Sequence, residues 1–122
     1  MDYRGTANDD VIDQKALGIA DHSSIWGGAG NDTITANTGN LIGEAGNDTI
    51  IGGDGNDTMV DTGGNNTVDG GLGNDRITTG TGNDRITAGD GDDVATDAGG
   101  NNTVDAGGGI DVLARQLADR LA

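Results

Sequence analysis

Residues 43–78 read GEAGNDTII, GGDGNDTMV, DTGGNNTVD and GGLGNDRIT, which are four nine-residue units in one phase. The phase continues without a gap through residues 79–114, and two further units occupy residues 5–13 and 27–35. Glycine prevails at positions 1, 2 and 4 of the unit, Asp or Asn at position 6, and an apolar residue at position 8. A fixed period this short predicts a solenoid, in which stacked repeats bury a continuous core.

Positions 7–9 of each unit predict a very short strand. Side chains alternate between the two faces of a strand, so position 8 points to one side while positions 7 and 9 point to the other. Because positions 7 and 9 are mainly Thr, Asp and Arg, we expect position 8 to face inward. Its residues are Ile34, Ile50, Met59, Val68, Ile77, Ile86, Ala95, Val104 and Leu113. Glycine permits the positive φ of a tight turn, and the Asn common at position 5 is the non-glycine residue most often found there.

Two units make one 18-residue turn of strand, loop, strand and loop. Stacked turns then form two parallel sheets, with about 4.8 Å between neighbouring strands and a thin aliphatic core between the sheets. The loops fall into two columns, one along each edge of the solenoid.

The phase before residue 43 requires two irregularities. If residues 14–17 are an insertion, residues 18–26 align as a decayed unit and residues 36–42 form a unit two residues short. Position 6 of the first column then carries Asp10, Asp32, Asp48, Asn66, Asp84 and Asn102. Position 6 of the second column carries Ser23, then a shortened turn, and then Asp57, Asp75, Asp93 and Asp111.

The C-terminal residues change to a helical pattern. Leu113, Leu117 and Leu121 share one face at i, i+4 spacing, which predicts an amphipathic helix over residues 112–122. We expect this helix to cap the open end, because solenoids need capped ends; a partner-binding or secretion-signal role is the alternative. The predicted parts of this one domain are a cap with degenerate repeats (residues 1–26), the nonapeptide block (residues 27–114) and the helix.

The chain has 122 residues, a net charge of −15, 25 glycines and only 2% aromatic residues. So much charge with so few large apolar side chains would ordinarily predict disorder, so the fold needs another source of stability. The charge comes from Asp, with Glu44 as the one glutamate, and it makes nucleic acid and anionic membranes unsuitable partners. Cysteine is absent, no stretch has the length of a membrane span, and the N-terminus has no signal-peptide pattern.

The unit resembles the G-G-x-G-x-D-x-U-x nonapeptide of RTX proteins, in which U is a large apolar residue. The resemblance implies an all-β, right-handed parallel β-roll that binds several calcium ions, about five to seven here. It also implies a coil that folds on binding extracellular calcium, as the folding and stability module of a larger type I-secreted bacterial polypeptide. We expect the module to be secreted, to insert into no membrane and to be a monomer.

Calcium takes six to eight oxygen ligands at about 2.3–2.6 Å, and it accepts carboxylates mixed with backbone carbonyls. Two loops stacked in one column could supply this set, each giving two carbonyls and one position-6 oxygen. The resemblance further implies that each position-6 Asp bridges two ions. The expected carbonyl ligands are those of Gly52, Gly53, Asp54, Gly55, Gly70, Gly71, Leu72, Gly73, Gly89, Asp90, Gly91, Gly107 and Gly109.

The two columns differ in their expected calcium affinity. From residue 57 onward the second column has only Asp, which predicts good sites at Asp57/Asp75, Asp75/Asp93 and Asp93/Asp111. In the first column, Asn66 and Asn102 each offer one acceptor oxygen, because an amide NH₂ cannot bind a cation. Sites beside these residues should be weaker, while Asp10/Asp32 and Asp32/Asp48 are further candidates. The Asn units also carry Asp61, Asp69, Asp97 and Asp105, which are either solvated charges or water-mediated replacements for the missing carboxylate.

No enzymatic activity is expected from this sequence. His22 is the sole histidine, and its polar neighbours are adjacent in sequence, whereas catalytic triads are assembled through space. A carbohydrate- or surface-binding module is the alternative function, similar to repeats that accompany alginate epimerases or occur in adhesins and S-layer proteins. A designed β-roll scaffold is the other alternative.

Overall fold

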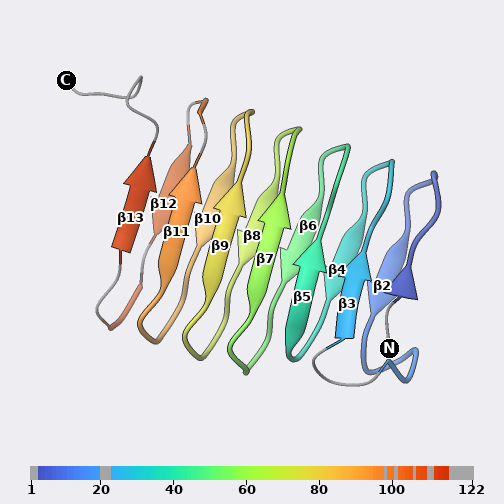
Figure 1. The fold of residues 1–122 in the computed structure, drawn as a ribbon, viewed down its shortest axis with the longest axis horizontal. Coiled ribbons are helices and arrows are strands. Elements are labelled where there is room, and N and C mark those ends of the chain that lie inside the picture. The colour runs from blue at the N-terminus through green and yellow to red at the C-terminus, as the bar shows by residue number, and fades with distance from the viewer. Residues whose placement is uncertain are drawn as a thin grey trace.

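The computed structural model describes residues 3–19, 23–97, 99–100, 102–105, 107–109 and 112–115. These residues wind into a β-solenoid in which the chain passes alternately through two parallel sheets (Figure 1). In that view the chain rises through the near sheet, returns through the far sheet and advances from right to left, which is a right-handed winding. The all-β fold with two parallel sheets confirms the prediction.

Each sheet collects every second strand of the chain. The seven-stranded sheet contains, in spatial order, β1 (Tyr3–Arg4), β3 (Ser23–Trp26), β5 (Gly39–Ile42), β7 (Thr58–Asp61), β9 (Arg76–Thr79), β11 (Val94–Asp97) and β13 (Val112–Arg115). The six-stranded sheet contains β2 (Val11–Asp13), β4 (Thr33–Thr35), β6 (Thr49–Ile51), β8 (Thr67–Asp69), β10 (Arg85–Thr87) and β12 (Thr103–Asp105). All pairings between these strands are parallel.

The core is made by position 8, which faces the space between the sheets. The register places Met59 between Leu41 and Ile77 in one sheet, and Ile50 beside Val68 in the other. Each sheet thus contributes one column of stacked aliphatic side chains. The position-8 residues exposed at 4% or less are Ile12, Ile25, Ile34, Leu41, Ile50, Met59, Val68, Ile77, Ile86 and Ala95. The predicted inward face is confirmed for these residues.

The irregular turns lie where the phasing predicts them. The main-chain N–H of Asp10 reaches the side chain of Asp32 across 22 residues, and that of Asp32 reaches Asp48 across 16, whereas later turns span 18. Gln14, which is 2% exposed, joins the insertion to the shortened unit, because its Oε1 accepts the N–H of Asn37 at 2.7 Å. A side chain from the insertion therefore satisfies main chain in the shortened turn.

Asn at position 5 has a different role from the predicted one. Positive φ occurs at glycines, as at Gly46 (109°), and Glu44 (72°) is the one non-glycine residue with positive φ in the described part of the chain. The Asn side chains instead link successive turns. Asn47 Oδ1 accepts the N–H of Asn65, and Asn65 Oδ1 accepts the N–H of Asn83, both at 2.8 Å. Position 5 is therefore a ladder of side-chain hydrogen bonds, not a left-handed turn position.

The prediction of a C-terminal helix is wrong for residues 112–115. Val112–Arg115 form β13, which pairs with β11 and places Leu113 opposite Ala95. Residues 106–114 keep the repeat phase, so pairing with the preceding turn outweighs the helical spacing of the leucines. Residues 116–122, the rest of the predicted helix, lie outside the described residues. Nothing in the described part forms a helix long and apolar enough to cross a membrane.

Candidate metal-binding edges

The loops form two edges of the roll. Loops that follow strands of the seven-stranded sheet make the first edge, along the top of Figure 1, and loops that follow the six-stranded sheet make the second edge, along the bottom. Position 6 directly precedes a strand, or begins one at Ser23 and Gly39, so the parallel register of the sheets stacks the position-6 residues of successive turns. From Asp32 on the first edge and from Asp57 on the second, the described position-6 Oδ1 atoms accept the main-chain N–H of the position-6 residue one turn earlier.

These hydrogen bonds confirm both predicted columns within the described residues. On the first edge they run from Asp10 N to Asp32 Oδ1 (2.8 Å), Asp32 N to Asp48 Oδ1 (2.8 Å), Asp48 N to Asn66 Oδ1 (2.8 Å), Asn66 N to Asp84 Oδ1 (2.8 Å) and Asp84 N to Asn102 Oδ1 (2.5 Å). On the second edge they run from Gly39 N to Asp57 Oδ1 (3.0 Å), Asp57 N to Asp75 Oδ1 (2.8 Å) and Asp75 N to Asp93 Oδ1 (2.7 Å). Gly39 thus holds position 6 of the shortened unit without a carboxylate. Asp111 lies outside the described residues.

The second carboxylate oxygen is buried without a hydrogen-bond donor. This holds for Oδ2 of Asp32, Asp48, Asp57 and Asp75, all exposed at 2% or less. Burial raises the pKa of Asp57 and of Asp75 to about 7, although each carboxylate accepts a main-chain N–H. Burial also raises the pKa of Asp32, and it raises that of Asp48 to about 6. A buried carboxylate is costly unless it is paired, so these open oxygens suit a cation.

Each open oxygen lies over the glycine at position 1 of its own unit. A Cβ built on Gly52 would lie 2.6 Å from Asp57 Oδ2 and 2.7 Å from the carbonyl oxygen of Gly70, one turn later. A Cβ built on Gly70 would lie 2.7 Å from Asp75 Oδ2 and 2.5 Å from the carbonyl oxygen of Ala88. A carboxylate and a carbonyl oxygen thus converge on space that only glycine leaves open. Calcium prefers this mixture of oxygen ligands, so the residues present fit the ion.

The first edge has a similar arrangement at Gly5, below Asp10 Oδ2, and at Gly27. A Cβ built on Gly27 would lie 2.6 Å from Asp32 Oδ2 and 3.0 Å from the carbonyl oxygen of Gly43. Asp10 differs, because its Oδ2 already accepts the main-chain N–H of Thr6 at 2.6 Å and the Thr6 hydroxyl at 2.9 Å. Both donors of Thr6 therefore already occupy the Asp10 oxygen that would otherwise be open to a cation.

Asn66 and Asn102, the two Asn residues at position 6, each donate a hydrogen bond from the side-chain amide to a carbonyl oxygen of their own loop. Asn66 Nδ2 donates to the carbonyl oxygen of Gly63 at 3.0 Å, and Asn102 Nδ2 donates to that of Gly99 at 2.9 Å. In these two loops the amide NH₂ group donates to a carbonyl oxygen that could otherwise bind a cation. This arrangement favours the expectation that position 6 of these two units contributes little to calcium binding.

Several predicted carbonyl ligands of the second edge already serve the stacking of turns. The oxygen of Gly53 accepts the N–H of Leu72 at 2.9 Å, and that of Gly71 accepts the N–H of Asp90 at 3.2 Å. Each of these oxygens has a second lone pair for a cation. Among the described residues, no three His, Cys, Asp or Glu side chains gather around one point. Carbonyl oxygens would therefore supply most ligands of a calcium ion here.

The sequence interpretation missed the inward direction of position 1. Asp61 and Thr79 end β7 and β9, and they are exposed at 1% and 0%. Asp61 Oδ2 and Thr79 Oγ1 have no hydrogen-bond partner. The interpretation of Asp61 as a solvated charge is therefore wrong, whereas Asp69 and Asp105 are indeed exposed. Strand alternation contained the signal, because position 1 follows position 8 by two residues and so faces the same side.

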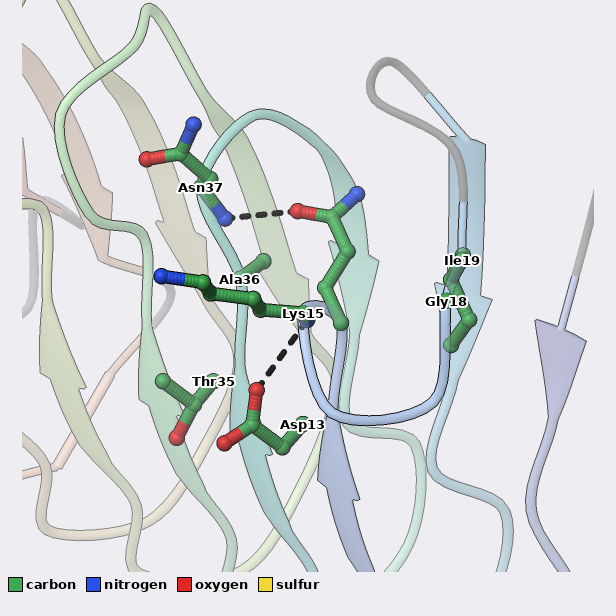
Figure 2. A pocket seen from close by; sticks show the side chains of 8 residues that line it. Asp13, Lys15, Gly18, Ile19, Thr35, Ala36 and Asn37 are labelled. Atoms are coloured by element: carbon green, nitrogen blue, oxygen red, sulfur yellow. Dashed lines mark hydrogen bonds between the residues drawn. The ribbon is translucent and has the colours of Figure 1, made fainter.

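A pocket of about 710 Å³ lies beside the insertion near the N-terminal end of the roll (Figure 2). Asp13 Oδ1 accepts the N–H of Lys15 at 3.1 Å, and the bond between Gln14 and Asn37 lies in the same wall. Its polar groups thus hold the insertion against the shortened unit, and Asp13 and Lys15 are its titratable side chains. The lining residues are Asp13, Gln14, Lys15, Gly18, Ile19, Thr35, Ala36 and Asn37.

Comparison with known families identifies the repeat. A family model described as RTX calcium-binding nonapeptide repeat (4 copies) matches residues 20–40, 41–60, 52–86, 60–95 and 78–113. Together the matches run from residue 20 to residue 113, which is well over half of the chain. No curated protein and no solved structure matches the chain.

Proposed function

Because the chain belongs to the RTX calcium-binding nonapeptide-repeat family, we propose that it is a calcium-dependent folding module, a coil without calcium and a β-roll with it. The observation that carries this proposal is the set of buried carboxylate oxygens without donors on both edges, from Asp32, Asp48, Asp57 and Asp75. At a pH above the raised pKa values of these carboxyls, where protons no longer neutralise them, a fold that buries so many acidic oxygens needs cations to offset them.

Without a cation, the stacked carboxylates oppose folding. The ladder holds the position-6 residues one turn apart, so their charges repel, and burial adds the cost of desolvation. The core offers little to offset this cost, because each unit contributes one large apolar side chain at position 8. Calcium supplies positive charge to the open Oδ2 and carbonyl oxygens, and its binding free energy then becomes folding free energy.

The two edges should hold calcium unequally. On the second edge, Asp57, Asp75 and Asp93 form an unbroken acidic stack, and we expect it to continue to Asp111. On the first edge, the amides of Asn66 and Asn102 interrupt the stack. We propose about five to seven ions in total, with the firmest on the second edge.

We propose that the module acts outside the cell, within a larger bacterial polypeptide exported by type I secretion. Extracellular calcium modules bind with dissociation constants of about 10⁻⁴–10⁻³ M, so such a chain stays a coil where calcium is scarce and folds after export. We assign it no enzymatic activity. We expect a monomer that binds neither nucleic acid nor membranes.

Calcium titration followed by far-UV circular dichroism and calorimetry tests this function. We expect calcium at about 10⁻³ M to convert a coil spectrum into a strand spectrum with measurable heat of binding. Magnesium should leave the coil unchanged, because it demands near-octahedral geometry and gives up water reluctantly. At a pH above about 8, where the raised carboxyls are ionised, a strand spectrum in chelator would refute the proposal, and so would the absence of calcium binding.

A further inference from the structure

Two carboxylates converge on one place on the first edge. A Cβ built on Gly43 would lie 2.6 Å from Asp48 Oδ2, and it would also contact Asp61 Oδ2 from the next turn. At the equivalent glycines Gly27, Gly52 and Gly70, the oxygen from the next turn is a main-chain carbonyl. The Gly43 space is therefore lined by a second negative charge where the other spaces have a neutral dipole.

Neither carboxylate has a partner that offsets its charge. Asp48 and Asp61 are each 1% exposed, and both Oδ2 atoms lack a hydrogen-bond donor. Burial and the neighbouring Asp48 carboxylate raise the pKa of Asp61 to about 8. The nearest arginines along the chain, Arg76 and Arg85, stand at exposed position 7 of their strands. Two buried carboxylates that face each other are strongly unfavourable unless they share a proton or a cation lies between them.

Asp61 belongs to the same unit as Asn66. That unit lacks a carboxylate at position 6, and it carries one at position 1, where glycine stands in the units of Asp32 and Asp48. Position 1 ends β7 and faces inward, so the side chain of Asp61 reaches the loop of the preceding turn. The unit therefore still has one carboxylate beside its loop, at position 1 (Asp61) where the units of Asp32 and Asp48 have it at position 6.

We propose that Asp61 is a direct ligand of a calcium ion held between the loops at residues 43–48 and 61–66, with Asp48 as the second carboxylate ligand. This inference rests on the proposed calcium-dependent folding, and it extends calcium ligation to a position that the nonapeptide pattern gives to glycine. It makes this site one of the stronger on the first edge, contrary to the weakness expected beside Asn66.

Asp61→Asn tests the inference, with Asp69→Asn as its matched control. Asp69 is in the same unit but is exposed at position 9, so both variants remove one charge. Calcium bound per chain is measured by equilibrium dialysis, and the calcium midpoint of folding by circular dichroism. We expect Asp61→Asn to bind about one ion fewer or to need about tenfold more calcium. Asp69→Asn should match the wild type.

Moving the carboxylate back provides a second test. Asp61→Gly should lose the ion, and Asp61→Gly combined with Asn66→Asp should restore it, because that pair recreates the unit of Asp48. If both single variants at Asp61 fail to fold, recovery in the double variant still supports the inference, and failure of the double variant overturns it. Binding by Asp61→Asn equal to wild type also overturns it. A wild-type chain that binds no calcium would instead overturn the proposed function.

Discussion

Position 6 and position 1 of the repeat act as a pair of residues. The position-6 carboxylate uses Oδ1 to bind the preceding turn and places Oδ2 over position 1. Gly52 and Gly70 do not have a positive φ, so glycine is needed there for space and not for backbone freedom. Some units have another residue in place of the position-1 glycine, and the space beneath the neighbouring carboxylate differs there. Ala88 is fully buried and puts a methyl group at position 1 of the Asp93 unit, whereas Asp61 puts another oxygen at position 1.

Asp75 is where the role of the open oxygen can be tested most simply. Asp75→Asn keeps an Oδ1 acceptor for the N–H of Asp57 but replaces Oδ2 by an NH₂ group, which cannot bind calcium. We expect the calcium midpoint of folding to rise about tenfold or more, corresponding to about 1.4 kcal/mol or more. Asp54→Asn keeps the main-chain carbonyl of residue 54 and alters only an exposed side chain of the same edge, so it should leave the midpoint unchanged. An unchanged midpoint for Asp75→Asn would contradict Oδ2 ligation.

Each strand contributes a single large side chain to the core. Ile77 in β9 lies between Met59 and Ala95 of the adjoining turns, and it is 0% exposed. We expect Ile77→Ala to cost about 2–5 kcal/mol, because the truncated side chain leaves a cavity. The measurement is the thermal midpoint in saturating calcium. Leu72→Ala is the control, since Leu72 is 51% exposed in a loop. Equal midpoints for the two variants would contradict a core held by position 8.

The register of the strands could be predicted from the sequence because the period is short and repeated. The insertion at residues 14–17 and the shortened unit at residues 36–42 were placed by phase alone. The start of the C-terminal helix was wrong, because Leu113 is both the first leucine of the helical spacing and position 8 of the last unit. Pairing with β11 decides in favour of the strand. The contact of Asp61 with Gly43 depends on two successive turns at once, so no single unit reveals it.

In the part of the chain that the structure describes, most acidic residues lie in the loops of the two edges. The net charge is −15, and the basic Arg76 and Arg85 lie on opposite sheets, so they form no single basic strip for a polyanionic ligand. Stability of the entire roll should therefore depend on what neutralises these acidic residues.

The raised pKa values predict how the metal-free chain responds to pH. In the roll the carboxyls of Asp57 and Asp75 titrate near 7, compared with an ordinary value of 3.8. The roll therefore binds protons more tightly than the coil does, so acid stabilises the roll and this contribution is lost as the pH rises through 7. We expect strand signal in calcium-free buffer to increase as the pH falls from about 8 to about 4. The Asp57→Asn, Asp75→Asn double variant should respond less, and an equal response would contradict the assignment.

The radius of gyration in chelator and in calcium, measured by small-angle X-ray scattering, tests the central claim most directly. A coil of this length has a radius of gyration of about 36 Å, and a compact chain about 14 Å. We predict the larger value without calcium and the smaller value at saturating calcium, with no compaction by magnesium. At a pH above about 8, where protons no longer neutralise the buried carboxyls, a compact particle in chelator would contradict calcium-dependent folding. A coil that persists in saturating calcium would contradict it equally.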